Sequence, residues 1–323
     1  MTDIFTHALL PYLIGNAIKL NKKNIAAFVV GGIAPDMDVF IMWINSVYPT
    51  FFLVTHRGLT HSLFFGFFAG IAVLYLASRS RVRAKLQRFI DFKPEISKGA
   101  VAFSYAGVVM HLLLDYTTTR GVPLLYPLET SRFSAEVFFY TDIYLTILSL
   151  IIIILLYKKI VRKDAHIKIL VIFLIVFAVL GGIRIEEKNS ALDLIKDNAA
   201  EAYPTMNIFD WYVLSGDNDQ IKIYEYDGLG HVSPYNGTFS RMNIGGEDNL
   251  SAALELSGNL PQVKLFMWRA YSVAVNASYD DGNWLIEYYD PLQDAMVRDY
   301  PAFFRRFNGQ VNVSVQGGRA FIS

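Results

Sequence analysis

Histidine and aspartate pairs at helical spacing are the residues of this sequence best suited to bind a metal ion. His111 is followed four positions later by Asp115, and Asp3 precedes His7 at the same spacing. Side chains at positions i and i+4 share one face of a helix, so each pair can bind an ion or orient its own members by a hydrogen bond. A single histidine–aspartate pair of this kind usually forms only a structural hydrogen bond. The metal hypothesis therefore requires further ligands nearby.

Two more polar groups interrupt apolar sequence in the same part of the chain. His56 and His61 bracket a glycine-containing turn before the apolar stretch 63–77, and Asp36 and Asp38 follow a proline that breaks a helix. Polar side chains at a membrane boundary are costly, and those with metal-binding chemistry are usually functional. We therefore expect these side chains to face the protein interior.

Together these groups offer four histidines and up to four aspartates, and the chain has no cysteine. This donor set suits zinc, with manganese or iron as alternatives, and is large enough for one or two ions. Two ions would activate water and hold both oxygens of a phosphoester. We expect Asp38 to be the spare carboxylate that acts as base. Arg57 is expected either to bind a phosphate or carboxylate group or to be an interfacial anchor.

The composition indicates a membrane protein. Hydrophobic residues make up 53% of the chain and charged residues only 18%, which is more apolar than an ordinary soluble protein. The formal net charge is zero, so no nucleic-acid partner is expected. The N-terminus lacks a basic region followed by a cleavage site, and we expect the spans themselves, rather than a removable signal peptide, to insert the chain.

Six apolar segments predict an α-helical polytopic membrane domain over residues 1–184. A membrane span needs about 20 apolar residues, so the shorter segments are expected to extend into their polar flanks or to be half-inserted. The second segment is broken by paired glycines and a proline. The segments are Ile4–Ile18, Ile25–Ile44, Leu59–Ala77, Ala100–Leu114, Ile143–Tyr157 and Ile167–Ile183.

Lysine and arginine concentrate in alternate loops and so predict the orientation. Positive residues cluster after the first, third and fifth segments, whereas the loops 45–58 and 119–141 carry only three arginines. Loops rich in lysine and arginine are cytoplasmic as a rule. We therefore expect a multi-pass protein of the cytoplasmic membrane, with the N-terminus, the histidine and aspartate groups and everything after residue 184 on the outer side.

Residues 185–323 differ in character and predict a small extracytoplasmic α+β domain. Short polar turns separate two pairs of strand-like segments, as is typical of hairpins. The expected helices are 186–202 and 248–256, and the expected strands are 211–215, 220–226, 271–276, 284–289 and 310–315.

Several short motifs carry a family resemblance. They are Asp3-Ile4-Phe5-Thr6-His7, Ala34-Pro35-Asp36-Met37-Asp38, His56-Arg57-Gly58-Leu59-Thr60-His61-Ser62, and His111-Leu112-Leu113-Leu114-Asp115-Tyr116 followed by Gly121-Val122-Pro123-Leu124-Leu125-Tyr126-Pro127. In this order they resemble the YdjM-like family of membrane-bound proteins described as metal-dependent hydrolases. The resemblance covers residues 1 to about 180, and weaker matches follow at Tyr203-Pro204-Thr205 and Phe209-Asp210-Trp211. It implies a metal site at His7, Asp36, Asp38, His56, His61, His111 and Asp115.

The order His, Asp, His, then His-x-x-x-Asp is also similar to the ligand order of zinc-dependent phospholipases C and related nucleases. Those enzymes use a further His-x-x-x-Asp/Glu pair and an N-terminal tryptophan, and this chain has neither. The comparison therefore implies one or two ions rather than three.

We interpret the chain as a membrane-bound metal-dependent hydrolase that acts at the outer membrane face, on a phosphoester or lipid-linked substrate among the membrane lipids. Two other classes fit the same residues. In an ion- or proton-coupled transporter the aspartates and histidines would form an ion path or a proton relay, and in a non-catalytic membrane protein they would only fix helix packing. Tightly bound metal would distinguish a hydrolase from a structural protein. Turnover by detergent-solubilised protein, without an ion gradient, would distinguish a hydrolase from a transporter.

Overall fold

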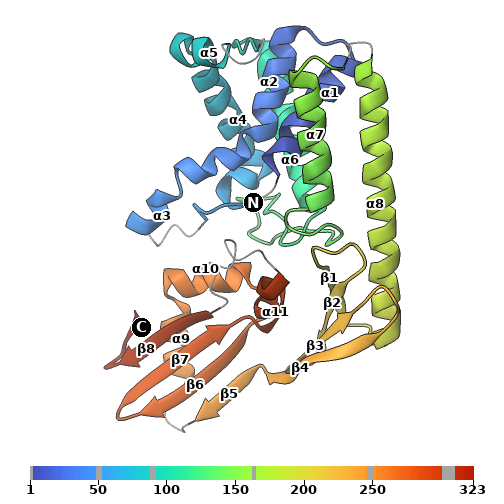
Figure 1. The fold of residues 1–323 in the computed structure, drawn as a ribbon. Helices are drawn as coiled ribbons and strands as arrows, with labels where there is room; N and C mark the ends of the chain where they lie inside the picture. Colours follow the sequence, from blue (N-terminus) through green and yellow to red (C-terminus); the bar gives the residue numbers. More distant parts are fainter. Residues whose placement is uncertain (1–2, 49–52, 88–91, 162–164, 246–249, 300–309) are drawn as a thin grey trace. The chain divides into compact units, whose positions relative to one another are not determined.

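The computed structural model describes residues 3–48, 53–87, 92–161, 165–245, 250–299 and 310–323, which form two compact units (Figure 1). The first unit comprises Met1–Trp43 and Val54–Gly182, and the second comprises Ile44–Leu53 and Ile183–Ser323. The main boundary between the two units lies after Gly182, two residues before the end of the membrane domain expected at residue 184.

Helices dominate the chain up to residue 195. Two of them, η1 and η2, are short 3-10 helices that connect longer α-helices. The helices are α1 (Ile4–Ala17), α2 (Lys22–Ile33), η1 (Pro35–Phe40), α3 (Trp43–Val47), η2 (Leu59–His61), α4 (Leu63–Ser78), α5 (Ser80–Leu86), α6 (Lys98–Tyr116), α7 (Ile143–Tyr157) and α8 (His166–Ile195).

Side-chain caps fix where the helices of the first unit begin. The carboxylate of Asp3 accepts a hydrogen bond from a backbone N–H in the first turn of α1, and the hydroxyls of Ser62 and Ser97 do the same for α4 and α6. Each cap satisfies an N–H that the helix leaves unpaired, and its loss typically costs about 1 kcal/mol. The caps at α1 and α4 stand next to the histidine motifs and so set the positions of those motifs.

Glycines let α2 approach α1 and α6 until their backbones touch. A Cβ atom on Gly31 would lie 1.8 Å from the carbonyl oxygen of Ser104, and one on Gly107 would lie 2.2 Å from that of Phe28. At Gly32 the nearest atom would be the carbonyl oxygen of His7, at 2.4 Å. Small residues at such crossings are typical of helices packed within membranes.

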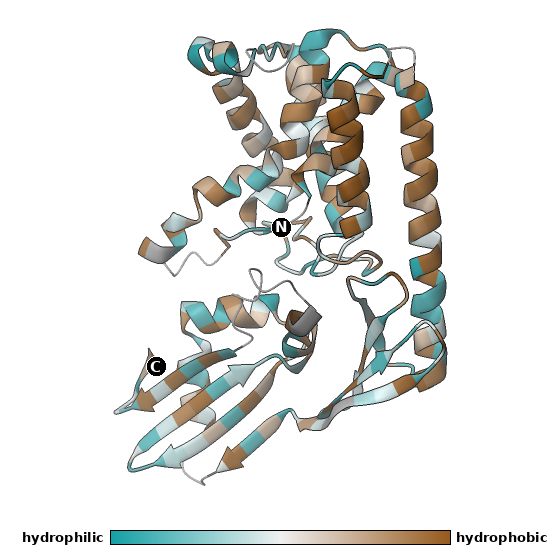
Figure 2. Ribbon diagram, in the orientation of Figure 1, coloured by the Kyte–Doolittle hydropathy of each residue, from teal (hydrophilic) through white to brown (hydrophobic). Residues whose placement is uncertain are grey.

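Among the described residues, two helices are long and apolar enough to cross a membrane, α6 with 19 residues and α8 with 30. The helices α4 and α7 are apolar but shorter, with 16 and 15 residues, and α7 is hydrophobic along nearly its whole length (Figure 2). The six spans expected from the sequence are not supported. α1 has 14 residues, and α2 has 12 because it ends at Ile33, just before Pro35 starts η1.

The second unit contains two β-sheets. The four-stranded sheet has the order β1-β2-β3-β4 and is antiparallel, and the five-stranded sheet has the order β5-β6-β7-β8-β9, with only β5 and β6 parallel. The strands are β1 (Glu201–Pro204), β2 (Trp211–Gly216), β3 (Gln220–Tyr226), β4 (Val232–Ser240), β5 (Met242–Gly245), β6 (Ala274–Asp280), β7 (Asn283–Tyr289), β8 (Gln310–Gln316) and β9 (Arg319–Ile322).

Helices α9 (Leu250–Gly258) and α10 (Pro261–Arg269) cover one face of the five-stranded sheet, and α11 (Pro291–Asp299) follows β7. Val263 and Phe266 of α10 pack in one core with Ile286 and Val313 of the sheet. The strands of this sheet alternate between hydrophilic and hydrophobic residues (Figure 2). Successive side chains of a strand point to opposite faces, so the second face of the sheet carries mostly polar side chains.

Several predictions for residues 185–323 are confirmed, and one is wrong. The two hairpins are present as β2–β3 and β6–β7, and the last expected strand is β8. The expected helix 248–256 is α9 from Leu250 onward, and residues 248–249 lie outside the described residues. The separate helix expected over 186–202 does not exist, because α8 continues unbroken to Ile195 and residues 201–204 form β1.

Candidate metal centre

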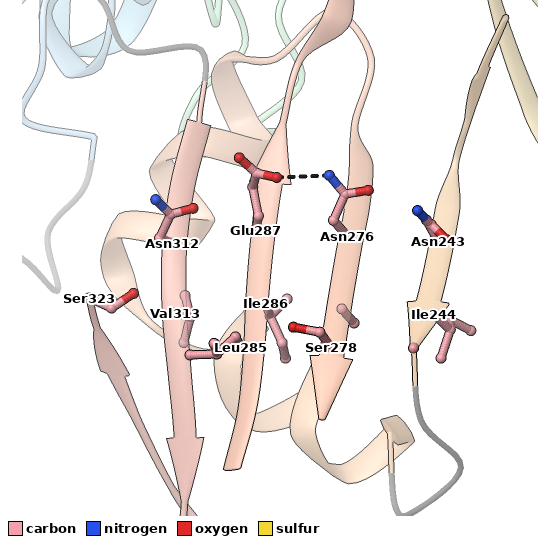
Figure 3. A pocket seen from close by; sticks show the side chains of 12 residues that line it. Asn243, Ile244, Asn276, Ser278, Leu285, Ile286, Glu287, Asn312, Val313 and Ser323 are labelled. Atoms are coloured by element: carbon pink, nitrogen blue, oxygen red, sulfur yellow. Dashed lines mark hydrogen bonds between the residues drawn. The ribbon is translucent and has the colours of Figure 1, made fainter. Parts of the chain in front are cut away.

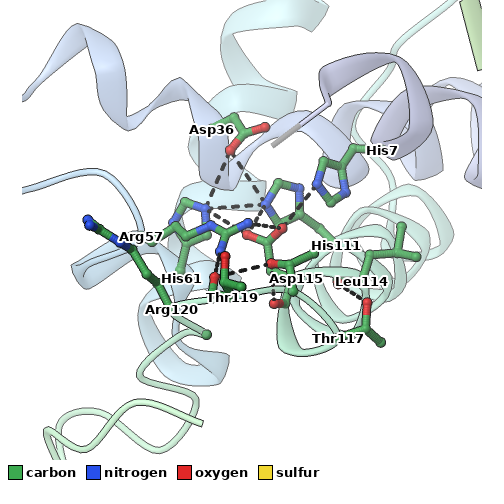
Figure 4. Close-up of polar contacts among 12 residues, drawn as sticks. His7, Asp36, Arg57, His61, His111, Leu114, Asp115, Thr117, Thr119 and Arg120 are labelled. Carbon is green, nitrogen blue, oxygen red and sulfur yellow. Dashed lines mark hydrogen bonds and ion pairs between the residues drawn. The ribbon is translucent and has the colours of Figure 1, made fainter. Parts of the chain in front are cut away.

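The ends of four helices meet at one place in the first unit. α1 and α4 begin here, the latter after η2, whereas α6 ends here and α2 ends here before η1. The expected ligand side chains at these ends point toward one another and are buried, none being more than 9% exposed (Figure 4). They are His7 of α1, Asp36 of η1, His61 of η2, and His111 and Asp115 of α6.

Four donor atoms form the centre of this cluster. They are Nε2 of His61, Nε2 of His111, Oδ1 of Asp36 and Oδ2 of Asp115. The two nitrogens are 3.3 Å apart, and the nitrogen–oxygen distances are 3.4 and 3.5 Å from His61 and 3.6 and 3.4 Å from His111. Ligand atoms of a tetrahedral zinc ion, with bonds of about 2.0–2.1 Å, lie about 3.3–3.4 Å from one another. These five distances match the spacing of ligands on one ion, and Asp36, His61 and His111 are close enough together to hold one.

Hydrogen bonds outside the cluster aim both imidazole rings inward. Nδ1 of His111 lies 2.7 Å from the carbonyl oxygen of Gly32, to which it donates, and this leaves the lone pair on Nε2. Nδ1 of His61 lies 3.1 Å from the hydroxyl of Thr60 and 3.4 Å from a carboxylate oxygen of Asp38. Both histidines thus have the outer partners that metal-binding histidines usually have.

The central carboxylate oxygens are buried without a hydrogen-bond donor among the residues that the structure describes. Oδ1 of Asp36 and Oδ2 of Asp115 are both of this kind, and they are the same two oxygens that face the imidazole nitrogens. A buried acceptor without a partner costs about 1–3 kcal/mol, and more when it is charged. A cation bound between the four atoms would remove this cost, so the residues present fit a divalent metal.

The charges of the cluster are compatible with a bound cation. Three buried or nearly buried carboxylates, those of Asp36, Asp38 and Asp115, lie in the cluster with one buried guanidinium, that of Arg57. Uncompensated buried charges cost several kcal/mol each. The two remaining negative charges can be neutralised by a divalent cation or by protons on two of the histidines.

Asp38 and His56 form a second group beside His61. Nδ1 of His56 lies 3.0 and 3.2 Å from the two carboxylate oxygens of Asp38, and its Nε2 lies 4.0 Å from Oδ1 of Asp36. Together with His61, these side chains are close enough to hold an ion of their own. All seven side chains implied by the family resemblance therefore lie in one connected cluster.

His7 contacts the cluster from the side of α1. Its Nε2 lies 3.2 Å from Oδ1 of Asp115, and its ring stacks on that of His111 with centroids 3.7 Å apart. His7, His111 and Asp115 form a third group that could hold an ion. Asp3, the other half of the expected pair, instead caps α1 and bonds to Thr6.

Arg57 is buried and contacts groups of the chain itself, among them a carboxylate. The side chain is 1% exposed, and it donates from Nη1 to the carbonyl oxygen of Thr119 at 2.7 Å and from Nη2 to Oδ1 of Asp115 at 3.3 Å (Figure 4). Its guanidinium also lies over the ring of Tyr140, 4.2 Å from the centroid. Arg57 therefore fixes one oxygen of Asp115 while the other faces the cluster.

Sequence reasoning missed the two groups that hold Arg57. Thr119 acts through its backbone carbonyl, which any residue possesses, and Tyr140 lies 83 positions after Arg57 in a loop without a motif of its own. Neither leaves a signal in spacing or residue type.

Residues 1–188 match the YdjM inner membrane protein family. The chain belongs to this family. The matched residues include the whole histidine and aspartate cluster, and the resemblance expected from the motifs is confirmed. The YdjM-family chain is also similar to the inner membrane protein YbcI of Escherichia coli (strain K12), with 30% identity over 140 residues, which is 42% of this chain and 73% of YbcI. No solved structure matches it. Family and relative together identify a protein of the cytoplasmic, or inner, membrane.

Proposed function

We propose that this YdjM-family protein is a metal-dependent hydrolase in which Asp36, His61, His111 and Asp115 hold the catalytic ion. The observation that carries the proposal is the set of five central distances, each between 3.3 and 3.6 Å, among atoms from three segments far apart in the sequence. A cluster that served only to pack helices would not need two donor-free carboxylate oxygens at its centre.

The bound ion, which we propose to be zinc with manganese or iron as alternatives, would supply Lewis-acid polarisation of the reacting oxygen. The chain's own groups do the rest. Asp38 holds His56, which at 17% exposed is the most exposed histidine of the cluster, and this pair is our candidate for the base that removes a proton from water. The buried histidines are held in fixed orientations by Gly32 and Thr60.

We further propose that the protein crosses the membrane several times and that the site and the second unit lie on the outer side. The basic residues of α5, and Lys22 and Lys98 at the starts of α2 and α6, lie at the helix ends opposite to the cluster. Such residues mark the cytoplasmic side. A site at the outer ends of membrane helices suits a phosphoester or lipid-linked substrate.

Metal analysis of the purified protein tests the site. Wild-type protein should contain stoichiometric metal, and His111→Ala should lose it. His231→Ala is a matched control, because His231 pairs with Asp227 at the same four-residue spacing but is 76% exposed. Wild-type protein without metal, or equal metal in wild type and His111→Ala, would contradict the proposed site.

Turnover tests the activity and separates it from the rival functions. Zinc- or manganese-loaded protein in detergent should cleave members of a phosphoester and lipid panel, and Asp115→Ala should abolish cleavage together with metal. A transporter would instead move ions across vesicle membranes and leave the whole panel intact. A structural protein would lose stability in both variants without any activity in the wild type.

A further inference from the structure

One face of the five-stranded sheet carries a row of amide and carboxylate side chains. Asn243 of β5 pairs in register with Asn276 of β6, which pairs with Glu287 of β7, which pairs with Asn312 of β8. Residues in register across a sheet point to the same face. The row therefore presents four polar side chains side by side, on the face opposite to α9 and α10 (Figure 3).

A groove of about 460 Å³ lies over this row. The next row on the same face is made partly of small residues, with Gly245 and Ser278 in register beside Leu285. Small side chains there leave space that larger ones would fill, and the volume lies within the range of roughly 300–1,000 Å³ common to small-molecule sites. Apolar surface is available at the same level, because Leu285 is 48% exposed.

The groove is polar but almost uncharged. Nδ2 of Asn276 donates to Oε2 of Glu287 at 2.7 Å, which fixes both side chains, while Asn243 and Asn312 are exposed. An amide offers two N–H donors and a carbonyl acceptor, which matches hydroxyl groups that both donate and accept. The described lining side chains include one carboxylate, that of Glu287, and no lysine or arginine. This charge pattern disfavours phosphate, nucleic acid and anionic lipid headgroups.

We propose that this groove binds a neutral oligosaccharide. The asparagines and Glu287 bond to sugar hydroxyls, and Leu285 packs against the apolar C–H face of a sugar ring. The inference rests on the sheet alone and is independent of the metal centre and of the proposed hydrolase activity.

Calorimetric titration of the full chain tests the proposal. The protein is purified in a detergent whose headgroup carries no sugar, and cellotetraose, maltotetraose and chitotetraose are titrated separately. At least one tetrasaccharide should bind saturably. Asn312→Ala combined with Glu287→Ala should weaken this binding at least about tenfold, since two or more hydrogen-bonding groups are lost. Gln220→Ala, which removes an exposed amide from a strand of the other sheet, should bind like the wild type.

Four results would overturn the proposal. They are the absence of saturable binding for all three sugars, equal binding by wild type and the groove variant, displacement of the sugar by inorganic phosphate, and saturation of the groove by calcium alone. Thermal unfolding of the groove variant confirms that it is folded, because both substituted side chains lie on the polar face of the sheet and outside its core. None of these results bears on metal content, so failure here is distinguishable from failure of the metal centre.

Discussion

Arg57 places a positively charged guanidinium in the buried interior of the cluster. A buried guanidinium needs counter-charge and hydrogen-bond acceptors, and it finds them in Asp115, in the carbonyl of Thr119 and in the face of Tyr140. In return it holds Oδ1 of Asp115, so that Oδ2 is left to face His61 and His111. Arg57 is thus a positioning residue for a candidate ligand.

Substitution of Arg57 should weaken metal binding. Arg57→Met should lower zinc affinity about 10–100-fold, which is typical when a partner that orients a metal ligand is lost. Arg57→Lys should recover part of the loss, because lysine keeps the charge but not the planar pair of donors. Competition with a chromogenic chelator measures both affinities. If Arg57→Met kept full zinc affinity and lost only turnover, Arg57 would instead act on substrate.

The sequence predicted the identity of the cluster residues better than their roles. Histidine and aspartate are few in the apolar part of the chain, and their spacing together with the family resemblance indicated which side chains cluster. Arg57 turns toward Asp115 because it also contacts the carbonyl of Thr119 in a loop. This contact determines which oxygen of Asp115 faces inward. Such contacts between residues distant in sequence cannot be read from spacing.

At the scale of elements, glycine contacts hold the helices that bring the candidate ligands together. The carbonyl of Gly32 accepts the hydrogen bond that orients His111, and Gly31 and Gly107 let α2 and α6 touch. The sequence indicated a helix break at the paired glycines, but it did not indicate which helix they approach. That information lies in the complementary positions of Gly107 and Ser104 on α6.

Gly107→Ala should destabilise the first unit. The added Cβ would lie 2.2 Å from the carbonyl oxygen of Phe28, and overpacking of this kind typically costs about 1–3 kcal/mol. Gly182→Ala in α8 is the control, since nothing lies within 4 Å of its Cβ position and alanine favours helix over glycine by up to about 1 kcal/mol. Melting temperatures in detergent should fall for the first variant and stay level or rise for the second. Equal shifts would refute the close contact.

A hydrogen bond joins the end of α8 to the four-stranded sheet. The hydroxyl of Tyr226 donates to Glu187 at 2.8 Å, and burial, followed by the bond to and charge of Glu187, raises the pKa of Tyr226 to about 12. Tyr226→Phe should therefore lower the free energy of unfolding by about 1 kcal/mol at neutral pH.

The pH dependence of this variant checks the assignment. A raised native pKa stabilises the fold fully below the unfolded tyrosine pKa of about 10, and the contribution is lost as pH rises toward the native value. The difference in melting temperature between wild type and Tyr226→Phe should be constant up to about pH 10 and shrink between pH 10 and 12. A difference in melting temperature that is already lost at pH 8 would contradict the raised pKa of Tyr226.

The extension of α8 explains one wrong prediction at this scale. The apolar pattern ends near Ile183, which suggested the end of a span and a new helix from 186, but no glycine or proline separates the two parts after Gly182. A helix continues across a change from apolar to polar residues when nothing breaks it. Hydropathy marks where surroundings change, whereas backbone breakers mark where helices end.

At the scale of the whole molecule, the division into a helical membrane part and a β-rich part was predictable, because composition changes near residue 184. The number of spans was not, since the helices α1, α2, α4 and α7 are all shorter than a membrane span although their sequences are apolar. Caps and helix-breaking residues set the length of each helix. That length, rather than hydropathy alone, determines which segments can cross the membrane.

The proposed orientation predicts the accessibility of engineered cysteines. The chain has no cysteine, so Ser251→Cys in α9 and Arg81→Cys in α5 provide single labelling sites on exposed positions. In intact spheroplasts an impermeant maleimide should label Ser251→Cys, and it should label Arg81→Cys only after the membrane is opened. The reverse pattern would place the second unit in the cytoplasm and the cluster on the inner side.

The order of residues in the chain has a consequence for how the protein would acquire the proposed metal. Every side chain of the cluster precedes residue 116 of 323, and Tyr140 completes the surroundings of Arg57 soon afterwards. Because synthesis and membrane insertion proceed from the N-terminus, all the candidate ligands are made before most of the second unit. We therefore expect metal to enter the nascent membrane domain. Once buried, the ion should exchange slowly. The metal found in the protein would then be the one that was most available when the membrane domain was inserted.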